Sequence, residues 1–335
     1  MSTSQALAPS VPPPDRSVRL MVLGGLQVLL GCLSALGALM MAALAFGGRM
    51  PQPPQGPPFN PRMMIPNVAI YVVIAVAFFW VGVGMIRIRR WAWALTLVVA
   101  WMGLICGLFA SVIMPIVMTK TWGSLAEQNQ MSPEMVRFMW TTTTLILVGL
   151  YVFLPGIFVV FCQPKSVRDT VYRRDPTPRW TDRCPLPVLA LCIMHAAGAV
   201  SMPLLATYNW VLPVFGFFLS GPAGAAVVCL LAVLLACLAW GTYRLEMLAW
   251  WGTVVLGIVY IANSIVLLSR GDLLPMYEKM GFPAETIEMI KKTGMLEMFS
   301  TYGVWMNVAF GAAWFGYLLY VRRYFVRESE MAGVA

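Results

Sequence analysis

The sequence predicts an all-α, polytopic membrane protein whose eight transmembrane helices form two parallel four-helix repeats. Hydrophobic residues make up 60% of the 335 residues and charged residues only 11%, whereas soluble domains are about 45–50% apolar and ~25% charged. Charge-free runs long enough to cross about 30 Å of hydrocarbon recur along the chain. One thirteen-residue segment also occurs twice in similar form, at 84–96 and 241–253.

Each charge-free run is long enough for at least one spanning helix of about 20 residues. In order, the runs are Leu20–Gly48, Met63–Ile86, Trp91–Thr119, Phe138–Pro164, Cys184–Tyr243, Met247–Ser269 and Met298–Val321. As one helix, the fifth run would be roughly 90 Å long, about three bilayers, so we expect it to fold back at Asn209–Pro213. Eight helices result, because irregular segments cannot face lipid with unpaired backbone groups.

These runs divide the chain into five parts. They are a disordered cytoplasmic tail (1–17), a first four-helix repeat (18–163), a basic cytoplasmic linker (164–185), a second four-helix repeat (186–324) and a cytoplasmic tail (325–335). The first run is too long for the apolar core of a signal peptide, so we expect it to be retained. We interpret the linker stretch RRDPTPRWTDRCPLP as the connection between the repeats, a hinge and not a reactive site.

The repeat rests on GMIRIRRWAWALT and GTYRLEMLAWWGT, in which five positions coincide. These are Gly84/Gly241, Arg87/Arg244, Ala92/Ala249, Trp93/Trp250 and Thr96/Thr253. One copy joins spans two and three and the other joins spans six and seven, which favours a parallel duplication about an axis along the membrane normal. We interpret both copies as tight cytoplasmic hairpins. Interfacial anchors at headgroup level are predicted to be Arg87, Trp93, Arg244, Trp250 and, in the linker, Trp180.

The distribution of positive charge predicts the orientation. If both termini are cytoplasmic, the 23 Lys and Arg residues divide into 15 inside and 8 outside, as the positive-inside rule requires. We therefore expect a multi-pass protein of the bacterial inner membrane. Its basic face would contact anionic lipid headgroups, so the net charge of +9 requires no nucleic-acid partner.

Polar residues inside the spans are the candidates for substrate contacts or for hydrogen bonds between helices. His195, the only histidine, is expected near the bilayer centre as a packed, hydrogen-bonded residue, with a substrate or proton-relay role as the alternative. Asn263 and Asn307 are expected to pair directly across neighbouring helices. No metal ligand set and no cofactor site are expected, since a second histidine is absent. The seven cysteines are expected to be small packing residues without a disulfide framework.

Two further segments invite structural interpretation. SGPAGAA, Ser220–Ala226, is expected either to kink span six or to permit close packing. In the outside loop Gly271–Glu297, the spacing of Pro283, Ile287 and Ile290 predicts a short helix ending at Gly294, with one apolar face against the membrane or the bundle; partner binding is the alternative. The proline-dense loop 48–66 is expected to be extended.

The chain carries no common enzyme motif and no acidic residue within any span. The linker carboxylates Asp169, Asp175 and Asp182 each adjoin an arginine, which predicts local charge balance, and Cys184 is expected to be a lone, slightly acidified thiol. We therefore expect a non-enzymatic scaffold or accessory subunit with membrane-protein partners or a homo-oligomeric state. The alternatives are a transporter of a small or lipid-like molecule with a site between the halves near His195, and a lipid-modifying enzyme.

The segment WTDRCPLPVLA and the repeated arginine-then-Ala-Trp turn resemble uncharacterised multi-pass membrane proteins of bacteria. The resemblance covers the linker, the beginning of span five and the hairpin turns. It implies a bacterial inner-membrane protein and carries no activity.

Overall fold

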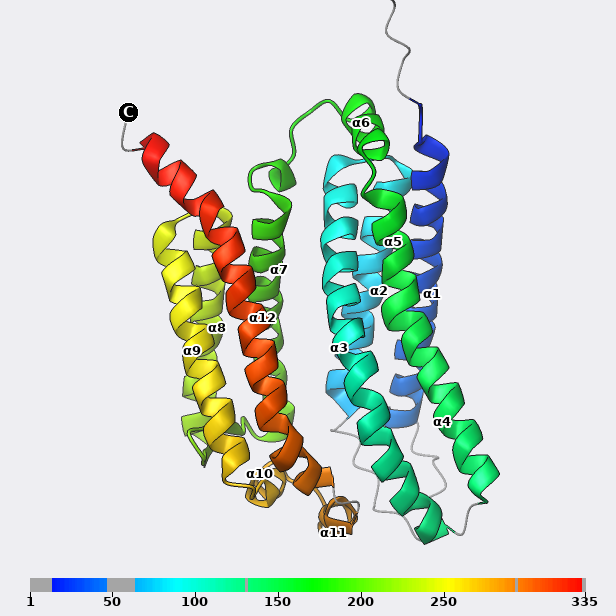
Figure 1. Cartoon of the computed structure of the whole chain (residues 1–335), viewed down its shortest axis with the longest axis vertical. Coiled ribbons are helices and arrows are strands. Elements are labelled where there is room, and N and C mark those ends of the chain that lie inside the picture. The colour runs from blue at the N-terminus through cyan, green and yellow to red at the C-terminus, as the bar shows by residue number, and fades with distance from the viewer. Residues whose placement is uncertain (1–13, 47–63, 130–131, 293–294, 333–335) are drawn as a thin grey trace, which may run out of the picture.

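The computed structural model describes residues 14–46, 64–129, 132–292 and 295–332. Within these ranges, eight helices are long and apolar enough to cross a membrane, and they stand side by side (Figure 1). The all-α class and the eight spans are therefore confirmed. Most of the predicted N-terminal tail, most of the proline-dense loop and Gly294 lie outside the described residues.

The first half consists of four spans. They are α1 (Ser17–Phe46), α2 (Ile65–Ile86), α3 (Arg90–Asn129) and a fourth span in which α4 (Pro133–Val148), the π-helical turn η2 (Gly149–Phe153) and α5 (Leu154–Cys162) follow without a break. α1 packs along α2, and α3 packs along the fourth span. α1 and α2 approach closely because neither Gly24 nor Gly82 has a side chain; a Cβ on Gly82 would lie 2.9 Å from the Gly24 carbonyl oxygen.

The linker and the second half follow. The linker contains α6 (Lys165–Arg174) and the 3₁₀ turn η3 (Trp180–Asp182). The four spans of the second half are α7 (Leu186–Ser201), which η4 (Met202–Tyr208) extends, α8 (Gly221–Tyr243), α9 (Met247–Ser269) and α12 (Met295–Ala332). Two short helices, α10 (Leu274–Lys279) and α11 (Ala284–Lys292), precede α12. α7 packs along α8, and α9 along α12. The linker lies at the same end as the start of α1 and the end of α12, called here the linker end (Figure 1).

The predicted fold-back of the fifth run is confirmed. After Tyr208 the chain turns through Asn209 and Trp210, whose φ angles are 55° and 54°, into an antiparallel hairpin of β1 (Leu212–Val214) and β2 (Phe217–Leu219). The expected kink in SGPAGAA does not occur, because Ser220 precedes the first turn of α8 and Pro222 lies within that turn. Close packing does occur, since a Cβ on Gly224 would lie 2.1 Å from the Trp210 carbonyl oxygen.

The irregularity lies in span four instead. Pro155 has no N–H, so the Tyr151 carbonyl four residues earlier has no partner in a regular α-helix. The helix widens there into a π turn, in which the Leu154 N–H donates to the Gly149 carbonyl. The Tyr151 carbonyl oxygen is directed at α3, where a Cβ on Gly107 would lie only 1.8 Å away. Gly107 therefore lets α3 pack against the widened turn.

The main cluster of buried side chains lies toward the linker end and joins the two halves. It includes Trp93 of α3, Val171 of α6, Leu189 of α7 and Phe325 of α12. Phe325 is fully buried and α12 continues to Ala332, past the predicted start of the tail at residue 325. The apolar side chains that close this core extend beyond the charge-free run.

Candidate functional site

The two similar segments form the same tight turn. In each, the third residue after the coinciding arginine begins the next helix. The residue directly after that arginine has a positive φ, which is 54° at Ile88 and 60° at Leu245. The Arg89 N–H donates to the Gly84 carbonyl at 2.9 Å, and the Glu246 N–H donates to the Gly241 carbonyl at 2.9 Å. Both glycines also lie against the coinciding alanine, since a Cβ would stand 2.6 Å from Ala92 Cβ and 2.7 Å from Ala249 Cβ respectively.

The coinciding tryptophans are buried donors, so their prediction as interfacial anchors is wrong. Trp93 and Trp250 are only 5% and 3% exposed. Trp93 Nε1 donates to the Cys162 carbonyl in span four, and Trp250 Nε1 donates to the Leu318 carbonyl in span eight, both at 2.9 Å. Each indole therefore ties the third span of its half to the fourth. Arg87, Arg244 and Trp180 are exposed, and their anchoring role stays a prediction.

The coinciding threonines also receive matching contacts from the first span of each half. Gln27 Nε2 of α1 donates to Thr96 Oγ1 at 2.9 Å, and His195 Nε2 of α7 lies 3.0 Å from Thr253 Oγ1. Thr253 Oγ1 also lies 2.8 Å from the Ala249 carbonyl oxygen. When its hydroxyl donates to that carbonyl, His195 is the donor of the contact to Thr253, through Nε2. The expectation that His195 is packed and hydrogen-bonded is confirmed. Gln27 was not among the predicted residues, although it is the only glutamine of the first run.

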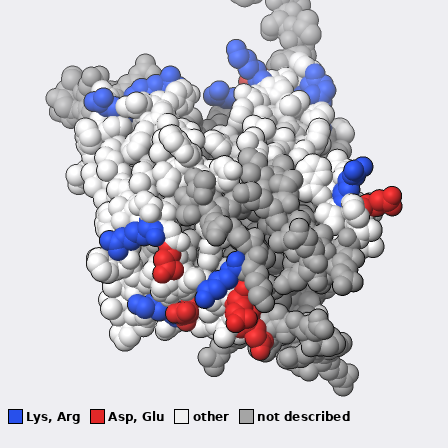
Figure 2. Space-filling model, turned by 60° about the horizontal axis from the view of Figure 1, so that its bottom comes forward, with Lys and Arg blue, Asp and Glu red and all other residues white. Residues whose placement is uncertain are grey.

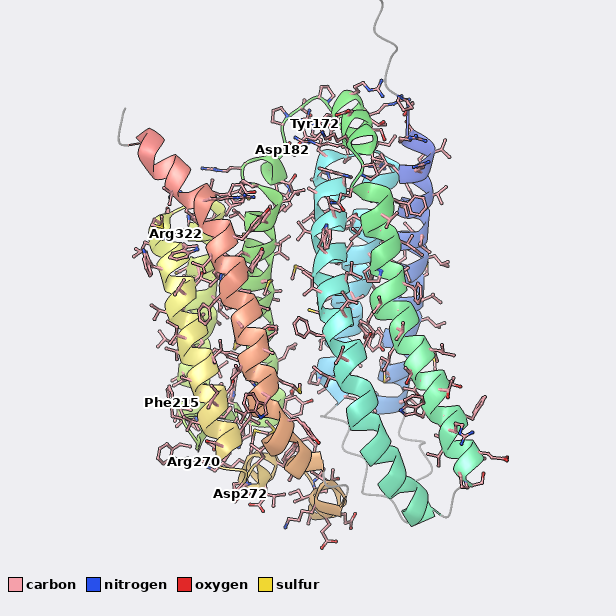
Figure 3. The ribbon with its side chains drawn as sticks, in the orientation of Figure 1. Tyr172, Asp182, Phe215, Arg270, Asp272 and Arg322 are labelled. Carbon is pink, nitrogen blue, oxygen red and sulfur yellow. The ribbon has the colours of Figure 1, made fainter. Side chains whose placement is uncertain are left out.

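The predicted amide pair between spans seven and eight is wrong. Asn263 holds the β-hairpin: its Oδ1 accepts the Phe215 N–H at 2.5 Å, and its Nδ2 donates to the Pro213 carbonyl at 3.2 Å. Phe215 has a φ of 46°, a conformation that this contact stabilises, and Arg270 also donates to the hairpin turn, at Gly216 (Figure 3). Asn307 Nδ2 instead donates to the Gly303 carbonyl of its own helix.

Asp175 is the centre of a hydrogen-bonded ion network in the linker. Its carboxylate is 3% exposed and accepts both Nη2 and Nε of Arg179, at 2.8 and 3.1 Å. It also accepts the backbone N–H of Arg90 at 3.2 Å and lies 3.5 Å from Arg89 Nη1. The paired Arg179 guanidinium is the main cause that lowers the pKa of Asp175 to about 2. The carboxylate thereby caps the positive end of α3 and holds the linker against it.

A second group of contacts extends this network. The Arg90 guanidinium lies over the Tyr172 ring, 4.0 Å from its centre, and 3.6 Å from Asp182; Tyr172 and Asp182 lie close together at the linker end (Figure 3). Charge balance between sequence neighbours is therefore the wrong prediction for Asp175 and Asp182, because their partners come from α3 and from later in the linker. Arg174 pairs with Asp15 instead.

The linker also contacts the second half. The Tyr243 hydroxyl at the end of α8 donates to the Trp180 carbonyl at 3.0 Å, and Arg183 lies over the Tyr243 ring. Cys184 is buried, and burial raises the pKa of its thiol to about 12, so the expected acidification is wrong. The linker is thus a folded brace between the halves.

At the opposite end, α11 lies against the bundle. Ile287 and Ile290 are buried, and Ile290 packs with Leu273 and Tyr277. The apolar face of α11 was expected to lie against the membrane or the bundle, and in the structure it lies against the bundle. Glu285, Glu288 and Lys291 remain exposed, and acidic and basic side chains lie next to one another on this end of the molecule (Figure 2).

The fold and these contacts define a multi-pass helical membrane protein. Comparison with protein-family models, curated proteins and solved structures finds no match. Functional inference therefore depends on the residues of this chain.

Proposed function

We propose that the chain is a non-enzymatic scaffold or accessory subunit of a complex in the bacterial inner membrane. The observation that carries this proposal is that polar side chains inside the spans form hydrogen bonds within the chain itself. Gln27, His195 and Asn263 bond to other parts of the same chain, and the linker carboxylates are held by arginines. Such contacts stabilise the arrangement of the helices, which is what a scaffold requires.

We further propose that the two halves are parallel repeats. The support is the set of matched contacts: the positive-φ turn, the glycine against alanine, the indole donor and the polar contact to threonine recur at corresponding places. In this proposal Gln27 and His195 do the same work in their respective halves, each donating one hydrogen bond to a threonine of the third span.

Replacing His195 by Gln should change the free energy of unfolding by less than about 0.5 kcal/mol, because the amide can donate to Thr253 as Gln27 does to Thr96. His195→Leu should cost about 1 kcal/mol, because it removes the donor. Equilibrium unfolding in mixed micelles measures both variants. If His195→Gln lowers the free energy of unfolding as much as His195→Leu does, Gln27 and His195 are not equivalent.

We propose that the linker end is cytoplasmic and faces anionic headgroups. The support is the excess of Lys and Arg on that side. The partner surface is then the exposed face of α11, on the outside, where Glu285 and Glu288 lie. Ile287 and Ile290 are excluded from this surface by their burial.

A membrane-impermeant, amine-reactive cross-linker tests this placement and the scaffold role together. In intact cells it should modify Lys291 and capture the same protein partner repeatedly, whereas Lys165 at the linker end should react only after the membrane is opened. Glu285→Lys with Glu288→Lys should abolish capture, and Glu246→Lys at the linker end should not. Modification of Lys165 in intact cells would reverse the orientation; capture that survives the α11 variant would remove the proposed surface.

A further inference from the structure

Helix α6 lies across the linker end of the first half as an amphipathic helix. It packs against α1, α3 and α5, and its buried face consists of Val167, Thr170 and Val171. Lys165 and Arg168 are exposed on its other side. Because the apolar face of α6 packs on the protein, its cationic side is the one that can face a headgroup layer.

The start of α1 brings two more cations to this helix. The Arg16 N–H donates to Thr170 Oγ1 of α6 at 3.2 Å. The Arg19 guanidinium lies 5.9 Å from the centre of the Phe161 ring, at the end of α5. Arg16 and Arg19 lie where the first span begins, and Lys165 and Arg168 lie just after the fourth span ends. We call these four residues the α6 basic cluster.

Of the carboxylates near the α6 basic cluster, Asp15, Asp175 and Asp182 pair with other arginines, whereas Asp169 of α6 is exposed. Asp15 bonds to Ser17 and pairs with Arg174 at 2.9 Å, and these contacts lower its pKa to about 2. Asp175 and Asp182 hold Arg179, Arg89 and Arg90. In the described ranges no carboxylate lies within 4.0 Å of a charged nitrogen of the α6 basic cluster.

The cluster also contains a buried donor without a partner. Arg16 Nε is enclosed and has no acceptor among the described residues. Arg168 lies over the Tyr172 ring, 5.3 Å from its centre, which leaves the edge of its guanidinium for an oxygen ligand. Because Arg16 Nε is enclosed, a lipid phosphate would bind through the exposed Arg19, Lys165 and Arg168.

We infer that the α6 basic cluster binds the phosphate of an anionic phospholipid of the surrounding membrane. The cluster lies at the ends of two spans, the depth at which lipid phosphates lie. Phosphate oxygens are strong acceptors for guanidinium groups. Phe161 is exposed beside Arg19, so an apolar surface for the acyl chain adjoins the phosphate site. This inference depends on the proposed function only in placing the linker end in a headgroup layer.

The full chain in lipid nanodiscs tests the inference. Discs of phosphatidylcholine containing phosphatidylglycerol should yield protein that retains phosphatidylglycerol when its bound lipids are identified by native mass spectrometry. Arg19→Gln with Arg168→Gln should weaken retention about 25-fold, since each cation near a lipid surface contributes roughly a fivefold factor. Arg137→Gln, an exposed charge removal at the opposite end, should leave retention unchanged. Both leaflets have the same composition, so the outcome is independent of orientation.

Three results would overturn the inference. The first is that the double variant retains as much phosphatidylglycerol as the wild type. The second is that the wild type retains phosphatidylcholine and phosphatidylglycerol equally. The third is that inorganic phosphate displaces the lipid at equal concentration, which would indicate a site for small anions. If the glutamine variant does not fold, Arg19→Lys with Arg168→Lys replaces it: this variant keeps the charge and should retain the lipid more weakly than wild type, because lysine cannot bind a phosphate through two donors. The cross-linking experiment tests α11, at the other end of the molecule. A negative result in the nanodiscs is therefore distinguishable from a failure of the scaffold proposal.

Discussion

Asp175→Asn is expected to lower the free energy of unfolding by about 3 kcal/mol, because it removes the charge from a buried carboxylate that arginines surround. The Arg179 pair and the cap on α3 would both weaken. Equilibrium unfolding in mixed micelles measures the change, and tryptic cleavage of the linker measures its local release. Asp169→Asn is the matched control, since Asp169 is exposed in α6 of the same linker and its replacement should cost less than about 0.5 kcal/mol.

The same carboxylate predicts a dependence on pH. Its folded-state pKa is about 2, below the unfolded value of about 3.9. Its contribution is therefore complete above about pH 4 and is lost as the pH falls through 2. The difference in stability between wild type and Asp175→Asn should be constant above pH 4 and shrink below it. A difference that stays constant down to pH 2 would contradict the assigned role.

Gly107→Ala should destabilise the first half by about 3 kcal/mol, because the new Cβ would lie 1.8 Å from the Tyr151 carbonyl oxygen. A backbone atom cannot rotate away, so α3 and span four must separate along the π turn. Gly103→Ala, one turn earlier on α3, is the control: its Cβ would lie 3.4 Å from Pro155 Cγ, an ordinary contact. Thermal unfolding of the two variants should differ by several degrees. Equal stability would mean that the close approach at Tyr151 is absent in the membrane.

The spans could be predicted because the bilayer requires long apolar runs, and the fold-back at Asn209–Pro213 because the fifth run is too long for one helix. The Trp93 and Trp250 positions were misread for a physical reason. An indole near the end of a span satisfies its N–H either at the lipid headgroups or at a carbonyl of the next helix. The sequence pattern is the same in both cases, and only the packing of α3 and α9 distinguishes them.

The linker shows a similar limit. Charge neighbours in sequence favour pairing of Asp175 with Arg174, yet the side chains of a short helix point in different directions, and Arg174 reaches Asp15 instead. The π turn could have been anticipated from Pro155, which removes an N–H inside a span. Gln27 could have been found by asking which polar group in the first run needs a partner in hydrocarbon.

The burial of Phe325 has a consequence for the order of folding. Phe325 belongs to the same cluster as Leu20 and Trp93, which lie in the first third of the chain. Pairs of neighbouring spans can associate as they enter the membrane, but this cluster closes only when α12 has inserted. Contacts between such distant parts of a chain form late and slowly. Until then, an incomplete molecule exposes apolar surface at the linker end, where chaperones and proteases of the cytoplasm would meet it in the proposed orientation.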